Sequence, residues 1–304
     1  MKFFQRPFSG DADKYEMSAL ARQSTTENLH VIDLPYRLSS WALNNPENVG
    51  LWFDEHKQLV GWAVLQTPFW TIDYVCHPFA ELALHQEILA WANQRGWAMR
   101  NSHFGHPTWF IMVLDDQINR IHDLEKAGFE CQTNVGEDSW SKVLMQRLTQ
   151  TPIKGYHPPS GFKVRSLAGE KEVSAYVELH RSVFESKNMT VEWRSRTLQH
   201  SEYKPDLDIV VESPHGYLVA FCICWFDANL SVGQVEPLGC HKDFRQYALG
   251  RVALSEGLHR LQSMGAKSIF VETDNYRNTA FRLYESLDFQ VIKNVLVYGK
   301  NYGE

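Results

Sequence analysis

The chain has 304 residues, of which 44% are hydrophobic and 22% charged, and its formal net charge at pH 7 is −6. An acidic balance without a basic run argues against nucleic-acid binding, and no apolar stretch has the length of a membrane span. We therefore expect neither nucleic acid nor membrane as a partner, and the length favours about two domains.

Cysteine and histidine usage points away from disulfides and metals. Five cysteines, an odd number without paired spacing, are typical of a reducing compartment. Residues 1–7 break a signal-peptide pattern too early, which predicts a cytoplasmic location. Cys222 and Cys224 share one face of an expected strand and are interpreted as buried thiols. The thirteen histidines show no metal-ligand spacing, so no metal site is expected.

The first half of the chain, residues 1–150, reads as a small α+β domain. Its pattern predicts a hairpin over residues 51–65, a strand over 72–78 and a helix over 83–94. It holds 12 basic and 18 acidic residues and eight of the ten tryptophans. Two interpretations of this composition stay open: a wall that attracts a cationic ligand, or tryptophans in the core with acids on a solvated face.

Residues 151–161 read Thr-Pro-Ile-Lys-Gly-Tyr-His-Pro-Pro-Ser-Gly, which is rich in turn formers and without periodicity. This segment is predicted to be a linker between a domain over residues 1–150 and a second over 162–304. The second domain holds 18 basic and 18 acidic residues, so the acidic excess lies entirely in the first half.

The second half predicts antiparallel hairpins followed by a strand-helix-strand unit. Strands are expected at 162–167, 208–212, 217–226, 233–240, 268–273 and 290–298, and helices at 170–184, 191–199, 249–264 and 279–287. This order predicts an α+β fold with a mixed, mostly antiparallel, twisted sheet flanked by helices. Such sheets bind ligands where the strand order opens.

The most informative segment is 238–251, Leu-Gly-Cys-His-Lys-Asp-Phe-Arg-Gln-Tyr-Ala-Leu-Gly-Arg, in which an apolar strand turns into an amphipathic helix. A compact loop before a helix start points several backbone N–H groups at one spot, and the helix dipole adds positive charge there. The segment therefore predicts an anion-binding site.

Two motifs in this half resemble those of one enzyme family. The loop resembles the coenzyme A signature of the GNAT acyltransferases (Arg or Gln, two residues, Gly, one residue, Gly or Ala), with Ala248 at the usual first Gly. The run from Asn278 to Phe289 resembles the family's Asn, Ala, Leu-Tyr-Glu and Gly-Phe pattern, with Ala280 one place early and Asp288 where Gly is usual. Asp tolerates the left-handed conformation better than most residues.

The resemblance implies two tandem GNAT-like domains, with acetyl-coenzyme A as co-substrate bound by the second. The first half resembles a degenerate copy, because residues 77–81 carry neither Gly nor Arg, and Glu81 would oppose a pyrophosphate. An unrelated α+β domain is the alternative. The implied coenzyme A contacts are Leu238, Gly239, Cys240, Arg245, Gln246, Tyr247, Ala248, Leu249, Gly250, Arg251 and Asn278.

The family chemistry is direct attack of an amine on the thioester, which needs a base and a donor for the oxyanion. Backbone N–H groups near Gly239 and Cys240 are implied to hold the acyl carbonyl. Glu236, a carboxylate in an otherwise apolar strand and on the face of Leu238 and Cys240, is the candidate general base. A salt-bridged Glu at a sheet edge is the alternative, and His241 is a weaker candidate because its turn should expose it.

Tyr284 stands where the family keeps a tyrosine near the coenzyme A sulfur, so it is the candidate acid for the departing thiolate, with core packing as the alternative. Asn278 either lines the pantetheine arm or simply caps a helix. Arg245 and Arg251 either supply charge to the phosphates or are surface arginines.

The sequence thus predicts an N-acetyltransferase acting on a primary amine of a small molecule. The alternative is a regulatory or scaffold protein that binds acyl-coenzyme A without transfer.

Overall fold

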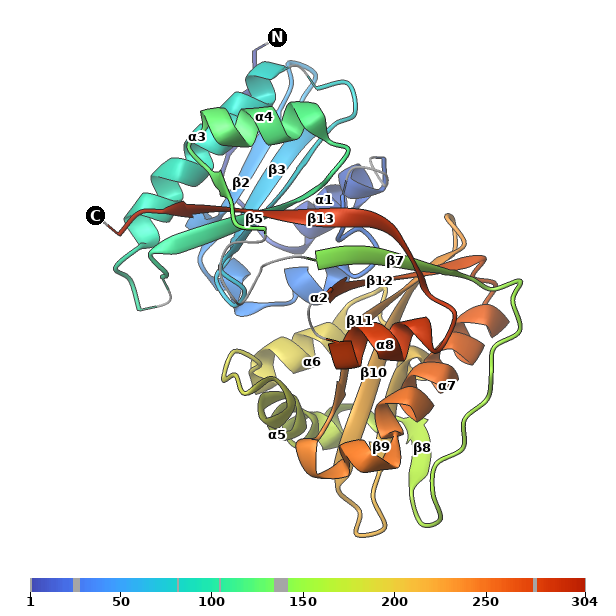
Figure 1. Cartoon of the computed structure of the whole chain (residues 1–304). Helices are drawn as coiled ribbons and strands as arrows, with labels where there is room; N and C mark the ends of the chain where they lie inside the picture. The colour runs from blue at the N-terminus through green and yellow to red at the C-terminus, as the bar shows by residue number, and fades with distance from the viewer. Residues whose placement is uncertain are drawn as a thin grey trace. The chain divides into compact units, whose positions relative to one another are not determined.

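The computed structural model describes residues 2–23, 28–80, 82–103, 105–133, 142–275 and 278–303. The chain forms two compact units (Figure 1). The N-terminal unit comprises Met1–Val143, Asp274–Tyr276 and Lys293–Glu304, and the C-terminal unit comprises Leu144–Thr273 and Arg277–Ile292. The first unit therefore includes the end of the chain, which the sequence pattern alone assigns to the second half.

The N-terminal unit is an α+β domain whose strands follow the order β1-β2-β3-β4-β5, continued by the end of β13. Neighbours from β1 to β4 pair antiparallel, whereas β4 and β5 are parallel. Its elements are β1 (Phe4–Arg6), α1 (Asp11–Gln23), α2 (Leu34–Leu38), β2 (Val49–Phe53), β3 (Leu59–Gln66), β4 (Thr71–Cys76), α3 (Leu82–Met99), β5 (Thr108–Leu114), α4 (Ile118–Lys126) and β6 (Glu130–Cys131), with short 3₁₀ turns at Trp41–Asn44 and Pro46–Asn48.

The C-terminal unit has the strand order β7-β12-β11-β10-β9-β8, antiparallel from β8 to β11 and parallel between β11 and β12. Its elements are β7 (Lys142–Leu148), β8 (Lys163–Ser166), α5 (Val173–Phe184), α6 (Val191–Gln199), β9 (Asp208–Glu212), β10 (Leu218–Asp227), β11 (Val232–Cys240), η5 (Lys242–Tyr247), α7 (Leu249–Ser263), β12 (Ser268–Asp274), α8 (Asn278–Glu285) and the start of β13 (Gln290–Asn301), with 3₁₀ turns at Gly169–Glu172 and Pro205–Leu207.

The two halves of the sequence exchange their last strands. Strand β7 closes the first half of the sequence, yet most of it belongs to the C-terminal unit, where it neighbours β12. Strand β13 closes the chain, and its end pairs antiparallel with β5, from Val295 opposite Leu114 to Asn301 opposite Thr108. Each unit is therefore completed by a strand from the other half of the sequence.

Two glycines set how closely the helices approach the sheet of the C-terminal unit. A Cβ on Gly257 of α7 would lie 2.7 Å from Cys224 Sγ, so α7 packs directly on β10. A Cβ on Gly239 of β11 would lie 2.5 Å from Phe221 Cζ and 2.7 Å from Val183 Cγ1. Phe221 and Cys224 are an odd number of positions apart in β10, and such residues face opposite sides of a strand. The helices α5 and α7 therefore cover opposite faces of this sheet.

The predicted fold class is confirmed, and most predicted elements lie within two residues of the observed ones. Residues 191–199 and 208–212 match α6 and β9 at both ends, whereas α3 continues five residues beyond the predicted end at 94. Cys222 and Cys224 are buried as expected, with their sulfur atoms 3.7 Å apart. Among the residues described, no helix is long and apolar enough to cross a membrane.

The tryptophans of the first half divide between core and surface. Trp52, Trp62 and Trp109 are at most 2% exposed, which confirms the core interpretation for these three. Trp70 and Trp97 are 40% and 56% exposed. Trp97 stacks with Arg100, whose Cζ lies 3.8 Å from the ring centroid. Trp140 lies outside the described residues.

Candidate active site

The turn from β11 into α7 forms a cationic loop at a helix start. Asp243 N–H donates to His241 Nδ1 at 3.3 Å and so opens η5, and the Ala248 carbonyl accepts from the Arg251 and Val252 N–H groups. The first turn of α7 holds no acidic residue. Arg245 is exposed and Arg251 is half-buried there. The electrostatics of this helix start therefore suit an anion.

Two departures from the family pattern fall on left-handed backbone. Ala248 and Asp288 have φ values of +54° and +65°, the region that favours Gly. The expectation that Asp288 adopts a left-handed cap is confirmed. Both residues therefore adopt the backbone conformation that the usual glycines would adopt.

Gly250 faces a narrow gap between β11 and α8. A Cβ there would lie 3.7 Å from Cys240 Cβ and 3.9 Å from Leu283 Cδ2, which is ordinary van der Waals contact. Burial raises the pKa of the Cys240 thiol, and a hydrogen bond from the Gly250 N–H opposes that rise. A methyl group fits at position 250, whereas a longer side chain would enter the gap.

The sheet opens directly beside this loop. In the described chain, β11 pairs with β12 only from Val232 to Gln234, although β11 continues to Cys240. The His241 N–H bonds Val219 O of β10 at 2.9 Å. Because N–H directions alternate along a strand, Gly239 N–H also faces β10, while the N–H groups of Leu238 and Cys240 face the opening. The alternation thus identifies Leu238 and Cys240 as the residues whose N–H groups face the opening, whereas the sequence indicated only N–H groups near Gly239 and Cys240.

Glu236 lies at an irregularity of β11 that borders the same opening. Strand β10 pairs Cys222 with Leu238 and Cys224 with Val235, so Glu236 and Pro237 together oppose the single residue Ile223. Such a bulge re-aims a side chain. Trp225 Nε1 donates to the Glu236 carbonyl at 2.8 Å and fixes the bulge.

Tyr284 comes close to Glu236 from α8. The Tyr284 side chain is 7% exposed and contacts Phe289 edge-on, with ring centroids 5.6 Å apart. Burial, and next the Glu236 carboxylate, raise the pKa of the Tyr284 phenol well above 10, so the phenol is protonated at neutral pH. The charge of Glu236 therefore acts on Tyr284, which links two of the predicted site residues electrostatically.

The remaining predicted residues lie around the loop. Gln246, Tyr247 and Ala248 are exposed, and Gln246 Nε2 donates to Asp243 O at 2.8 Å. Leu249 is buried under the helix start. The His241 side chain is 27% exposed, less than its place in a turn suggests, because it caps η5. Asn278 is the first residue of α8, and its side chain lies outside the described part of the chain.

A buried polar cluster near Glu236 was not anticipated from the sequence. Arg194 and Asp208, both 0% exposed, form an ion pair, and Tyr203 donates to Asp208 Oδ2 at 2.7 Å. The Arg194 guanidinium lies 3.9 Å from the centre of the Tyr176 ring. Burial chiefly, together with a minor effect of Glu236, raises the pKa of Tyr176. The signal that could have found the cluster is Asp208 at the head of the apolar run Ile209–Val211.

Arg147 of β7 was also missed. It is 1% exposed and donates to four backbone carbonyls, those of Leu287, Leu148, Thr151 and Pro152, at 2.8 to 3.1 Å. Burial lowers its pKa, and Asp288 partly offsets this effect. Arg147 therefore ties β7 to the end of α8 and to the linker.

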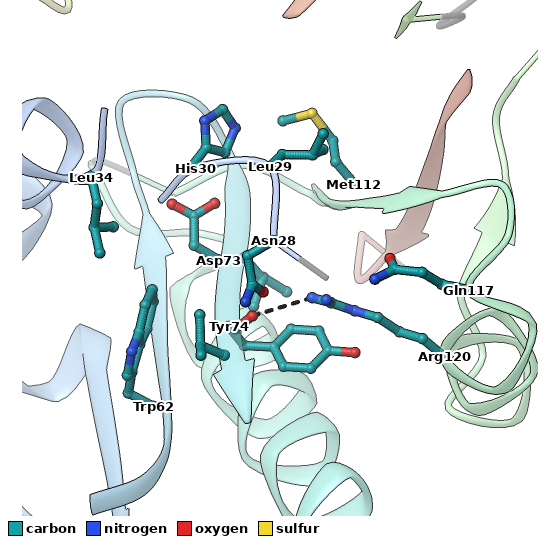
Figure 2. A pocket seen from close by; sticks show the side chains of 12 residues that line it. Asn28, Leu29, His30, Leu34, Trp62, Asp73, Tyr74, Met112, Gln117 and Arg120 are labelled. Atoms are coloured by element: carbon teal, nitrogen blue, oxygen red, sulfur yellow. Dashed lines mark hydrogen bonds between the residues drawn. The ribbon is translucent and has the colours of Figure 1, made fainter. Parts of the chain in front are cut away.

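The N-terminal unit has a pocket at the corresponding opening (Figure 2). There β4 and β5 pair only at Thr71 and Phe110 in the described residues. Arg120 of α4 donates to the Tyr74 carbonyl at 3.2 Å, and its Cζ lies 3.9 Å from the Tyr74 ring centroid. Burial raises the pKa of Tyr74 to about 12. The stacked Arg120 and Tyr74 side chains thus occupy part of this opening.

Fold and site together define a class: an α+β protein of two similar units, of which the second has a cationic loop beside an open sheet edge. Residues 173–289 match the acetyltransferase (GNAT) family model. Over its whole length the chain resembles a tandem GNAT protein from the clavulanic acid biosynthesis pathway (TM-score 0.66, 11% identity, 100% and 99% of the two chains). A GCN5-related N-acetyltransferase from Sphaerobacter thermophilus gives a TM-score of 0.65 at 16% identity, covering 99% and 96%.

Curated relatives match only part of the chain. Mycothiol acetyltransferases from Thermobispora bispora and Thermomonospora curvata are 26% and 25% identical over 153 and 155 residues, or 48% and 49% of this chain. These matches cover 52% of each relative, so the chain spans about half the length of the curated relatives it matches. Residues 173–289 thus form a domain of the acetyltransferase (GNAT) family, and the whole chain shares the fold of a tandem GNAT protein.

Proposed function

We propose that the protein is an N-acetyltransferase that transfers the acetyl group of acetyl-coenzyme A to a primary amine of a small molecule. The observation that carries the proposal is the sheet opening between β11 and β12, with an anion-binding helix start at its end and Glu236 and Tyr284 at its side. The matched GNAT family and the acetyltransferase names of the curated relatives support the same reaction.

The residues of the site fit coenzyme A. The loop from Arg245 to Arg251 is cationic, and Arg251 Nε is buried without a hydrogen-bond partner in the described structure. Gly250 has no side chain where the loop meets β11 and α8, which would let a narrow pantetheine arm pass close to the backbone. The loop would hold the phosphates, and the bound molecule would supply an activated acetyl thioester.

Each candidate residue then has one role in the transfer. Glu236 accepts a proton from the attacking amine, directly or through water, as the new C–N bond forms. The N–H groups of Leu238 and Cys240 stabilise the oxyanion. When the C–S bond breaks, Tyr284 gives its proton to the sulfur. Glu236 then releases the amine proton to solvent, and Tyr284 takes up a proton from solvent. The products are the acetamide and the free thiol of coenzyme A.

The acceptor is proposed only as a class. The curated relatives are named for mycothiol, and at 25–26% identity over about half their length they support acetyl transfer rather than one particular amine. The alternative is a protein that binds acyl-coenzyme A without transferring the acyl group.

The test combines calorimetry with thiol release. We expect the full chain to bind acetyl-coenzyme A and to release free thiol faster when amines from a mixed panel are added. Mass spectrometry of the amines should then identify an acetylated product. Binding without amine-dependent thiol release would favour the regulatory alternative, and absence of binding would remove both.

A further inference from the structure

The linker is held along α7, beside which it lies in Figure 1. Two side chains of α7 bond backbone carbonyls there: Gln262 bonds Thr149 O, just before the linker, at 2.7 Å, and Ser255 bonds Lys154 O at 2.7 Å. Arg147 of β7 bonds Thr151 O and Pro152 O between them at 3.1 and 3.0 Å. The contacts move from the end of α7 toward its start as the linker proceeds. The linker therefore runs antiparallel to α7 and leads to the cationic loop.

The far end of the linker is fixed at the loop itself. Phe162 packs against Phe244 and Tyr247 of η5, with ring centroids 6.2 and 5.3 Å apart. Pro158 and Pro159 precede it and restrict the backbone between the two anchored ends. The side chains of Lys154 and Tyr156 consequently have a defined position beside the first turn of α7.

Two cations approach the ring of Tyr156 in this position. Lys154 Nζ lies 5.2 Å and Arg251 Cζ 5.4 Å from the ring centroid, both within cation-π range. Within the described ranges, neither cation forms an ion pair with a carboxylate, and Arg251 Nε is buried without a hydrogen-bond partner. The cluster of Lys154, Tyr156 and Arg251 thus holds two positive charges that no described acid neutralises.

The position of this cluster at the start of α7 makes its unneutralised positive charge still less favourable. Arg251 is the third residue of α7, and the first turn of a helix disfavours positive charge because the helix dipole is positive there. Lys154 adds a second cation to the same end. A multiply charged anion would relieve both unfavourable effects, because it would pair with both side chains and with the helix start.

We propose that Lys154, Tyr156 and Arg251 bind the 3′-phosphate of coenzyme A, so that the linker is part of the nucleotide site. This assignment rests on the proposed function, in which the loop over residues 245–250 holds the pyrophosphate. The 3′-phosphate is a separate, doubly charged group on the same molecule, and the cluster lies next to the loop. Tyr156 positions the two cations, and Lys154 and Arg251 pair with the phosphate oxygens.

The experiment compares coenzyme A with 3′-dephospho-coenzyme A by calorimetry on the full chain. We expect the wild type to prefer coenzyme A by about 10- to 100-fold, as charge-assisted hydrogen bonds would give. Lys154→Gln should lower this preference at least about fivefold, because it should weaken the binding of coenzyme A and leave the binding of 3′-dephospho-coenzyme A unchanged. Tyr156→Leu should lower it too, because the ring no longer positions the cations. The preference of the wild type should fall with added salt.

Lys187→Gln is the matched control, because Lys187 is exposed on the loop after α5 and the substitution changes charge equally. It should leave the preference unchanged. Equal wild-type affinities for the two nucleotides, or equal losses for both in Lys154→Gln, would overturn the assignment and leave the proposed function standing. A wild type that binds neither nucleotide would overturn both.

Discussion

The two units differ most where their corresponding strands end. In the C-terminal unit, residues 241–248 separate β11 from α7 and include η5 and the left-handed Ala248. In the N-terminal unit only residues 77–81 separate β4 from α3, and Phe79 there is 88% exposed. The sheets and helices on either side are similar, so the difference lies in a surface loop that core packing does not constrain.

The interiors of the two units, by contrast, contain the same kinds of interaction, although at different positions in the fold. Arg37 pairs with Asp73 at 2.7 Å in the N-terminal unit, and Arg194 pairs with Asp208 in the C-terminal unit. In each unit an arginine also stacks on a tyrosine ring, Arg120 on Tyr74 and Arg194 on Tyr176. The carboxylate comes from β4 in one unit and from β9 in the other, so the two units share a kind of interaction and not an equivalent pair. The comparison teaches that both interiors accept a buried arginine pair, while the loops after β4 and β11 differ.

Gly250→Glu should have the largest effect and make the C-terminal loop as unsuited to anions as residues 77–81. The carboxylate would enter the gap beside Cys240 and Leu283 and repel phosphate, so coenzyme A affinity should fall more than about 100-fold in calorimetry. Gly250→Ala is the control and should bind nearly as the wild type does. Unchanged affinity in Gly250→Glu would contradict the placement of the phosphates.

Glu236→Gln should slow acetyl transfer by about 10²- to 10⁴-fold with coenzyme A affinity intact, because it removes the proposed base. The loss should be greatest at low pH, where the amine is protonated. Glu47→Gln, which removes an exposed carboxylate of the N-terminal unit, should leave transfer unchanged. A loss below about threefold in Glu236→Gln at every pH would assign the proton to water instead.

Arg194→Met and Arg37→Met test whether the buried ion pairs of the two units contribute equally to stability. Each should lower the free energy of unfolding by about 3–5 kcal/mol in urea titrations, because a carboxylate loses its partner inside the protein. Arg95→Met, which breaks an exposed pair with Glu47, should cost about 1 kcal/mol or less. Similar values for all three variants would show that burial does not distinguish these pairs.

Tyr284→Phe should slow transfer by at least about tenfold while costing at most about 1 kcal/mol of stability. Burial and Glu236 raise the pKa of this phenol, so it stays protonated up to about pH 10. The ratio of wild-type to mutant rates should therefore be constant from neutral pH to about pH 10. A mutant with the wild-type rate would leave Tyr284 as a packing residue.

Ala248→Gly should have the smallest effect and a favourable one. Ala248 is held at φ +54°, where a Cβ is strained, so Gly should raise the free energy of unfolding by about 0.5–1 kcal/mol. Thermal unfolding would measure the gain, and Ala253→Gly, in the middle of α7, is the control that should lose stability. Destabilisation by Ala248→Gly would mean that the methyl group contributes packing.

The sequence predicted the elements and the loop because both depend on local patterns. Helix α6 and strand β9 have clear periodicity and match their predicted ends, and residues 238–251 carry a motif. The strand exchange could not be predicted, because the alternation within β7 and β13 does not specify a partner strand. Arg147 could not be predicted either, because arginine is rarely buried and backbone carbonyls leave no motif.

The strand exchange has a consequence for how the chain is made. Ribosomes deliver residues from the N-terminus onward, at about 5–20 residues per second. Leu114 of β5 must remain without its partner until Val295 has emerged, so the edge of β5 stays open while all the residues between them are made. An exposed strand edge is a template for pairing with other chains. The nascent protein thus has to keep this edge of its first-made sheet from pairing with other chains until Val295–Asn301 have been translated.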